Sequence, residues 1–316
     1  MNIDILRIIA LLDIILIHTL KSQNNFDILN FMFTFVSIGI NLFIMISGYL
    51  LLDKEENIWV FYKKRFFSII PLFVMWSIIY IIYYKENPLY VIAGYRYAAG
   101  HLWYVPMIIG LYIITPWLRK VLKYCEKETR MVILMWFIIN ILNPALIFFK
   151  LPFLNLSAFP ITGFLGYYLL GYYIRKYKDK IHVNYYKVLY IVGFIFTFTV
   201  SWYFMKIVGK KNVFFYDKNS ISVFFMSVSF FVIIIKMNFT YIKGRTAAII
   251  KFLSGHSYFV YLAHLLFYET GMLITKNFYM VTLLCIGASY FTAFIYAEAE
   301  KTAGKIFRNR RTQNRE

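Results

Sequence analysis

The first twenty residues, Met1 to Leu20, read MNIDILRIIALLDIILIHTL, and they place ionisable side chains in an apolar run long enough to cross a bilayer. Arg7 and His18 are eleven positions apart, which on an α-helix puts them about 20° apart on one face and about 16 Å apart along the axis. Ionisable side chains inside a membrane helix cost free energy unless they face a protein interior or water. We therefore expect this helix to line a functional site.

A purely structural role for these side chains stays open from the sequence. Arg7 can reach the membrane interface and pair with Asp4, three residues away on the same helix. His18 can lie at the opposite interface, and Asp13 has no assigned role. The face that Arg7 and His18 share favours a functional role for this pair.

The composition predicts an all-α integral membrane protein. The 316 residues are 61% hydrophobic and 16% charged, and the apolar runs repeatedly exceed the roughly 18 residues that cross a bilayer. A net charge of +19 would indicate nucleic acid as the partner of a soluble protein, but here the cations lie in short segments between apolar runs. We therefore expect no nucleic-acid partner. About ten transmembrane helices are predicted, near residues 4–20, 31–52, 66–84, 102–118, 131–149, 158–174, 186–205, 219–235, 255–275 and 279–297.

The distribution of charge predicts the topology. Most of the 34 lysines and arginines fall in alternate segments, which include both ends of the chain. Because cytosolic segments are enriched in cations, both termini are predicted to be cytosolic. The chain then consists of one membrane domain over residues 1–300 and a basic cytosolic tail over 301–316, which we expect to be disordered and close to lipid headgroups. No secretory cleavage site follows the first apolar run, so we expect the first helix to be retained.

The two cysteines and several glycines have simple interpretations. Cys125 and Cys285 lack the spacing of a metal or redox site, and we expect neither a metal nor a disulfide. Several small residues are expected to let neighbouring helices approach closely. They are Gly39, Ser47 and Gly48 in the second predicted span, and Gly163, Gly166 and Gly171 in the sixth.

A basic run of Lys63, Lys64 and Arg65 stands at the cytosolic mouth of the third predicted span. Three adjacent cations usually anchor a helix or contact anionic lipid. A site for an anionic ligand is the alternative.

Two further motifs lie at or near the outer ends of predicted spans. Residues 100–104, Gly-His-Leu-Trp-Tyr, bring Trp103 and Tyr104 to a level where such aromatic side chains are common, and His101 to the predicted level of His18. Histidines there can serve acid–base catalysis or can be hydrated interfacial residues. In the ninth span, Tyr261 and His264 lie three residues apart, and His264 can be a ligand-binding group or can hydrogen-bond a neighbour.

Taken in order, these motifs resemble those of membrane acyltransferase family 3, in particular the stand-alone O-acetyltransferases that modify bacterial surface glycans. The motifs are Asp4 to Arg7 followed by His18, Phe43 to Tyr49, Lys64-Arg65 with Pro71, His101 to Tyr104, and Ser257 to His264. The resemblance implies a ten-helix core in the bacterial cytoplasmic membrane. It also implies transfer of an acyl group, usually acetyl, from cytosolic acyl-CoA to a hydroxyl of a surface or lipid-linked glycan.

The resemblance also implies roles for individual residues. Arg7 and His18 match the catalytic pair, and Lys64 and Arg65 match the basic motif for the CoA phosphates. Ser68 departs from the pattern, because many members carry an arginine there, so Lys63 is added to the candidate donor site. Further candidates are His101 for catalysis and, for binding the acceptor, Trp103, Tyr104, Tyr261 and His264.

The expected partners follow from the same resemblance. Acetyl-CoA or another acyl-CoA is the co-substrate, a glycan or lipid-linked glycan is the acceptor, and membrane lipid surrounds the protein. No permanently bound cofactor is expected.

A polysaccharide or lipid-linked sugar exporter is the alternative function, since transporters also have many spans and intramembrane charges. Transporters commonly contain internal repeats. The two halves of this chain show no such repeat, and the charged motif of the first helix has no counterpart, which favours the enzyme.

Overall fold

The computed structural model describes residues 1–20, 23, 25–148, 163–207 and 214–313, and this part of the chain contains helices and turns but no strand. The α-helices are α1 (Asn2–Thr19), α2 (Phe26–Val36), α3 (Gly39–Leu51), α4 (Ile58–Tyr84), α5 (Pro88–Ile92), α6 (Tyr104–Tyr124), α7 (Glu126–Phe137), α8 (Asn143–Phe148), α9 (Leu165–Lys176), α10 (Val183–Lys206), α11 (Ile221–Lys236), α12 (Gly244–Gly255), α13 (Ser257–Ile274) and α14 (Phe278–Gln313). A π-helical segment, Ile138–Leu142, joins α7 to α8, and a 3₁₀ turn, Gly100–Trp103, leads into α6. The predicted all-α class is confirmed.

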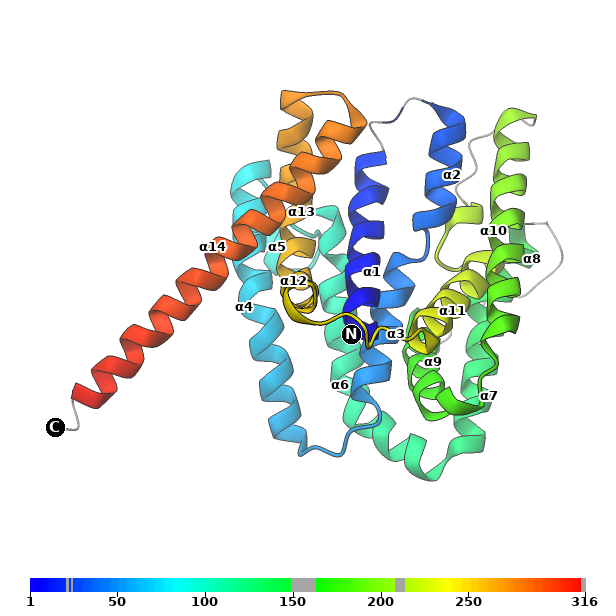
Figure 1. Cartoon of the computed structure of the whole chain (residues 1–316), viewed down its shortest axis with the longest axis horizontal. Coiled ribbons are helices and arrows are strands. Elements are labelled where there is room, and N and C mark those ends of the chain that lie inside the picture. The colour runs from blue at the N-terminus through cyan, green and yellow to red at the C-terminus, as the bar shows by residue number, and fades with distance from the viewer. Residues whose placement is uncertain (21–22, 24, 149–162, 208–213, 314–316) are drawn as a thin grey trace.

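Helix α1 stands inside the bundle, as Figure 1 shows. It contacts α2, α3, α11, α12, α13 and α14, and Leu6, Leu11 and Ile15 are fully buried. A helix enclosed by protein can carry polar side chains at membrane depth because they face other side chains rather than lipid. This packing explains how α1 can carry Asp4, Arg7, Asp13 and His18 within an apolar sequence.

In the part of the chain that the structure describes, seven helical segments are long and apolar enough to cross a membrane, which supports a multi-pass membrane protein. They are Phe26–Leu51, Ile58–Tyr84, Gly100–Tyr124, Glu126–Leu146, Val183–Lys206, Phe214–Lys236 and Phe278–Thr302. Three predicted spans are not among them, and the count of ten stays a prediction. Helix α1 contains three charged side chains in 18 residues, α13 contains His264 and Glu269, and the span at 158–174 begins outside the described residues.

The second predicted span is divided into α2 and α3, and glycines set the packing of α3. A Cβ atom on Gly39 would lie 2.6 Å from the Cβ of Asp13 in α1. On Gly48 it would lie 1.8 Å from the carbonyl oxygen of Tyr168 in α9, and on Gly171 it would lie 2.1 Å from that of Met45. These contacts confirm close helix packing at Gly39, Gly48 and Gly171.

The other two glycines of the sixth predicted span differ from each other. A Cβ atom on Gly166 would lie 2.0 Å from the ring of Trp136, which confirms close packing there. A Cβ atom on Gly163 would have nothing within 4 Å, so the packing prediction is wrong at this position, where the backbone has a φ of +81° that favours glycine.

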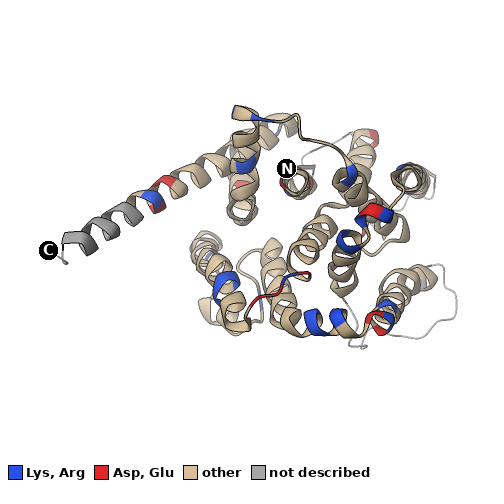
Figure 2. Cartoon of the chain, turned by 60° about the horizontal axis from the view of Figure 1, so that its bottom comes forward, with Lys and Arg blue, Asp and Glu red and all other residues tan. Residues whose placement is uncertain are grey.

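One end of the bundle gathers charged side chains. Figure 1 places the connections α3–α4, α6–α7 and α9–α10 at its lower end, and in Figure 2 the positions of lysines and arginines are spread across that end, with acidic residues among them. We name it the basic face, defined by residues 52–65, 119–130 and 175–180. Residues 301–313 are helical, so the expectation of a disordered tail is wrong for them. Helix α14 contacts α13 and α1, and its C-terminal part runs away from the bundle (Figure 1). It continues past the predicted end at residue 297.

Candidate active site

A cavity of about 770 Å³ lies between α1, α3, α4, α6, α12, α13 and α14. Its charged lining residues are Arg7, Lys54, Arg65 and Glu300, and serine and tyrosine hydroxyls supply most of the remaining polar lining. The polar residues are Ser47, Ser68, Tyr104, Tyr112, Ser254, His256, Ser257, Tyr258, Tyr261 and Tyr296. A pocket of this size and polarity suits a polar organic ligand that carries negative charge.

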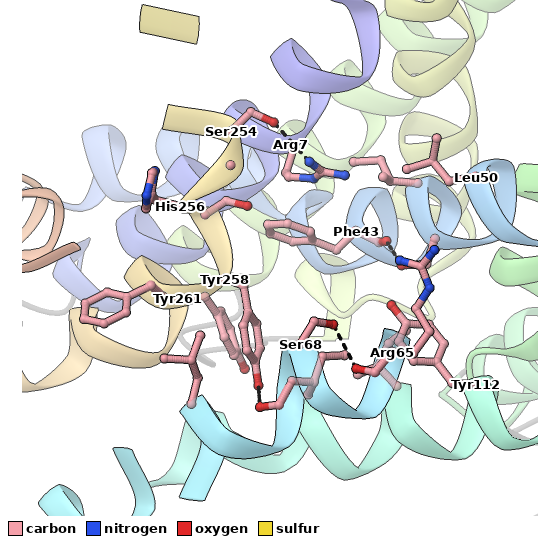
Figure 3. Close-up of a pocket in the computed structure, with 18 of the residues that line it drawn as sticks. Arg7, Phe43, Leu50, Arg65, Ser68, Tyr112, Ser254, His256, Tyr258 and Tyr261 are labelled. Atoms are coloured by element: carbon pink, nitrogen blue, oxygen red, sulfur yellow. Dashed lines mark hydrogen bonds between the residues drawn. The ribbon is translucent and has the colours of Figure 1, made fainter. Parts of the chain in front are cut away.

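Arg7 lies against α12 at the cavity wall (Figure 3). Its Nη1 atom donates a hydrogen bond of 3.1 Å to Ser254 Oγ, and Ser254 Oγ donates one of 3.0 Å to Asp4 Oδ1. Asp4 forms its ion pair with the amino group of Met1, at 3.2 Å. The sequence left open a direct ion pair between Arg7 and Asp4. In the structure these two side chains are instead linked through Ser254 Oγ.

The three cations at the start of α4 have different surroundings, because successive residues of a helix point about 100° apart. The side chain of Lys63 is exposed. Lys64 is also exposed and donates a 2.7 Å hydrogen bond to Glu56 Oε1 in the loop before α4. Only Arg65 lines the cavity, where it is half-buried, and its Nε atom has no hydrogen-bond partner among the described residues.

The carboxylate of Glu56 reflects this basic surrounding. The hydrogen bond from Lys64 lowers the pKa of Glu56, and the positive charges of Lys64, Arg119 and Arg65 lower it further against a partial loss of hydration. Arg119 Nη2 lies 3.8 Å from Glu56 Oε2. The positive charge of Lys64 is therefore compensated by the carboxylate of Glu56.

Ser68 follows Arg65 by one helical turn and also lines the cavity. Its Oγ donates a 2.8 Å hydrogen bond to the carbonyl oxygen of Arg65, as Figure 3 shows. The position where many family members carry arginine thus faces the same cavity, but here it supplies a short hydroxyl.

Three histidines from different helices meet deeper in the bundle. The ring centroids of His18 and His264 are 5.2 Å apart, those of His101 and His264 are 4.9 Å apart, and those of His18 and His101 are 6.4 Å apart. His264 is fully buried and His101 is 4% exposed. The predicted shared level of His18 and His101 agrees with this contact, and we name the three residues the histidine cluster. No group of three or more His, Cys, Asp or Glu in the described ranges is arranged to hold a metal ion.

Tyr261 lies at both the cavity and the histidine cluster. Tyr104 and Tyr261 line the cavity, and their rings are 5.3 Å apart. The hydroxyl of Tyr261 donates to the carbonyl oxygen of His101, and its ring lies 5.8 Å from that of His264. The two sites therefore adjoin at the side chain of Tyr261.

Trp103 is placed differently from the other candidates. It does not line the cavity but stacks on Phe164 at 5.6 Å, with Lys218 Nζ 5.7 Å from its ring.

Several residues of these sites were not identified from the sequence. Ser254 and Tyr258 lie within or beside the quoted motif of the ninth span, so their position was a usable signal. Tyr80 in α4 contacts the ring of His101 at 5.4 Å, and nothing in its sequence context distinguishes it from the other tyrosines.

A family model described as an acyltransferase domain matches residues 2–298. The match extends from α1 into α14 and includes the histidine cluster and every cavity-lining residue except Glu300. No curated protein and no solved structure matches the chain. The family model covers far more than half of the sequence, and it agrees with the ordered motifs from Asp4 to His264. The chain therefore belongs to membrane acyltransferase family 3 and is a membrane-bound acyltransferase.

Proposed function

We propose that this acyltransferase moves an acyl group, most simply acetyl, from cytosolic acyl-CoA to a hydroxyl of a cell-surface or lipid-linked glycan in a bacterial cytoplasmic membrane. The observation that carries the proposal is the path of α1, which brings Arg7 to a charged cavity and His18 to a buried histidine cluster. Family membership favours this enzyme over the exporter.

The orientation of the protein follows from its charges in this proposal. The basic face lies in the cytosol, as the excess of cations there favours, and both termini are cytosolic. Tags after Glu316 and within residues 119–130 are then cytosolic, and a tag beside His101 is external. Protection assays on such tags measure this, and a cytosolic His101 segment would overturn both topology and mechanism.

The cavity is the proposed donor site. Acyl-CoA carries phosphates, which form strong hydrogen bonds with arginine, and Arg65 and Arg7 are the arginines in the lining. Lys63 and Lys64 stand near Arg65 on the basic face and add attraction over a longer range. Arginine side chains do not act as general bases, so the proposed role of Arg7 is to bind the donor.

The histidine cluster is the proposed site of acyl transfer. His18 takes the proton of the acceptor hydroxyl while its oxygen bonds to the acyl carbon, and the carbon–sulfur bond to CoA then breaks. The imidazolium returns the proton to the leaving thiolate, so that the step yields an ester and free CoA. His101 and His264 adjoin His18 and contact the acceptor in this proposal, together with Trp103, Tyr104 and Tyr261.

Mass spectrometry of cell-surface glycans tests the proposal. Cells with and without the protein are grown on isotopically labelled acetate, and the expected result is a labile, labelled acetyl increment that requires the protein. Identical glycan masses in the two cultures would overturn the proposed acceptor class. An increment of another mass would instead replace acetyl by a different acyl group.

A further inference from the structure

The carbonyl oxygen of Leu262 in α13 is contacted by side chains from two other parts of the chain. The hydroxyl of Tyr80 in α4 donates to it at 2.9 Å, and Nε2 of His101 lies 3.2 Å from it. The same Tyr80 hydroxyl accepts the backbone N–H of Leu266 at 3.1 Å. Tyr80 is fully buried and so contacts both ends of one turn of α13.

These contacts fix which nitrogen of His101 carries a proton. A carbonyl oxygen accepts hydrogen bonds and cannot donate them, so Nε2 must be the N–H, and Nδ1 of the neutral ring is then a bare acceptor. Nδ1 is buried and has no hydrogen-bond partner among the described residues. The tautomer is thus assigned from the hydrogen-bond network.

His264 has the opposite arrangement. Its Nδ1 atom lies 2.6 Å from the carbonyl oxygen of Tyr261, so Nδ1 carries the proton and Nε2 is bare. This Nε2 atom also has no partner within the described ranges. The cluster therefore contains two bare acceptors on rings 4.9 Å apart, which suits a ligand that donates hydrogen bonds, such as a hydroxyl.

Tyr80 holds one side of this arrangement in place. Its ring meets that of His101 edge to face, at 5.4 Å, while its hydroxyl fixes the Leu262 carbonyl that His101 contacts. The His101 contact of 3.2 Å is at the long end of the usual range, so a small displacement of the carbonyl or of the ring breaks it.

We propose that Tyr80 is a positioning residue that holds His101 with its proton on Nε2, leaving Nδ1 as a hydrogen-bond acceptor for a hydroxyl of the acyl acceptor. The use of Nδ1 by the acceptor rests on the proposed function. The tautomer and its dependence on Tyr80 do not.

Nitrogen NMR on the full chain in lipid nanodiscs tests the proposal. The protein is labelled with ¹⁵N-histidine, and the signals of His101 and His264 among the five histidines are assigned by comparison with His101→Gln and His264→Gln. In the wild type we expect protonated Nε2 at His101 and protonated Nδ1 at His264. A proton on Nδ1 of His101 in the wild type would overturn the proposal without any variant.

Tyr80→Phe keeps the ring and removes the hydroxyl. We expect His101 to populate both tautomers while His264 stays unchanged. Acyl transfer should fall by about 10- to 100-fold, as expected when a group moves by about 1 Å. A His101 signal that remains entirely in the Nε2–H form in Tyr80→Phe would refute the role of Tyr80.

The matched control is Tyr84→Phe. Tyr84 lies one turn further along α4, stacks on Tyr80 at 5.8 Å and donates its hydroxyl to Glu269 Oε1. We expect this variant to retain the wild-type tautomers and a transfer rate within about twofold, since its hydroxyl does not touch α13 backbone near His101. If Tyr80→Phe shifts the tautomer while wild-type protein acylates no glycan, the positioning role stands and the proposed function fails.

Discussion

The cavity and the histidine cluster are neighbours with opposite physical characters. The cavity is lined by arginine, lysine and many hydroxyls beside the basic face, whereas His101 and His264 in the cluster are buried and enclosed by aromatic rings. Charged residues suit the binding of an anionic donor, and a region that excludes water suits bond exchange that water would otherwise intercept. Helix α1 supplies Arg7 to the cavity and His18 to the histidine cluster, so in the proposed function it connects the donor region to the region of acyl transfer.

The largest expected effect comes from the reaction side. His18→Gln keeps size and hydrogen bonding but cannot cycle a proton, so acyl transfer should fall by roughly 10²–10⁴, as for the loss of a general base. Acyl-CoA affinity in detergent should stay within about twofold, because His18 does not line the cavity. Glycan mass spectrometry and donor binding measure the two quantities.

A wild-type level of glycan acylation by His18→Gln at normal expression would assign the base elsewhere, with His101 the next candidate. A loss of donor affinity as large as the loss of activity would contradict the assignment of donor binding and acyl transfer to separate regions.

The second effect concerns the donor side and distinguishes the contributions of two cations in the basic run, Arg65 and Lys63. Arg65→Gln removes a half-buried charge from the cavity and should weaken acyl-CoA binding by about 10- to 100-fold, as loss of a charge-assisted hydrogen bond does. Lys63→Gln is the matched control, because Lys63 is exposed and does not line the cavity, and it should weaken binding by no more than about twofold at 0.15 M salt. Titration of purified protein with acyl-CoA measures both affinities. Equal losses of affinity in the two variants would favour a role of the basic run in anchoring the helix to lipid.

Part of this arrangement was predictable from the sequence for a physical reason. Charged groups in an apolar helix are costly, so Arg7 and His18 stood out from their surroundings. The level of His101 followed from its place at the end of a predicted span. The all-α class followed from the apolar runs, and the glycine contacts followed from residue size.

The remaining features depend on how helices are rotated and placed against one another. Ser254 and Tyr80 are common residue types, and only the packing of α12 on α1 and of α4 on α13 brings them to Arg7 and Leu262. Which of Lys63, Lys64 and Arg65 faces the cavity depends on helix phase near a boundary that hydropathy locates only within a few residues. The division between α2 and α3 falls inside a continuous apolar run, so hydropathy could not reveal it.

A smaller effect is expected where Ser254 links Arg7 to Asp4. Ser254→Ala removes the acceptor of the Arg7 Nη1 hydrogen bond and the donor to Asp4, while Arg7 and its charge remain. Acyl-CoA affinity should fall by about 3- to 10-fold, the value of one hydrogen bond to a charged group. Ser257→Ala, in the same cavity lining, is the control and should stay within about twofold. A greater loss in Ser257→Ala than in Ser254→Ala would show that Ser254 does not position Arg7.

The smallest expected effect is on stability and concerns Glu56 at the basic face. The hydrogen bond from Lys64 holds the pKa of Glu56 below its ordinary value of 4.5, so the folded state favours the carboxylate. For a group with a depressed pKa in the folded state, the stabilisation is complete above the unfolded pKa and is lost as the pH falls through the folded pKa.

Glu56→Gln should therefore lower the unfolding free energy by at most about 1 kcal/mol at pH 7, as for an ion pair open to water. The difference should shrink as the pH falls below 4.5. Thermal unfolding in detergent across this pH range measures the difference in stability between variant and wild type. Lys64→Gln should lower the unfolding free energy by most of the same amount, because it removes the partner of Glu56. A deficit in Glu56→Gln that stays constant down to acid pH would show that the carboxylate charge does not stabilise this face, and Lys64 would then be free to contribute its full charge to the donor site.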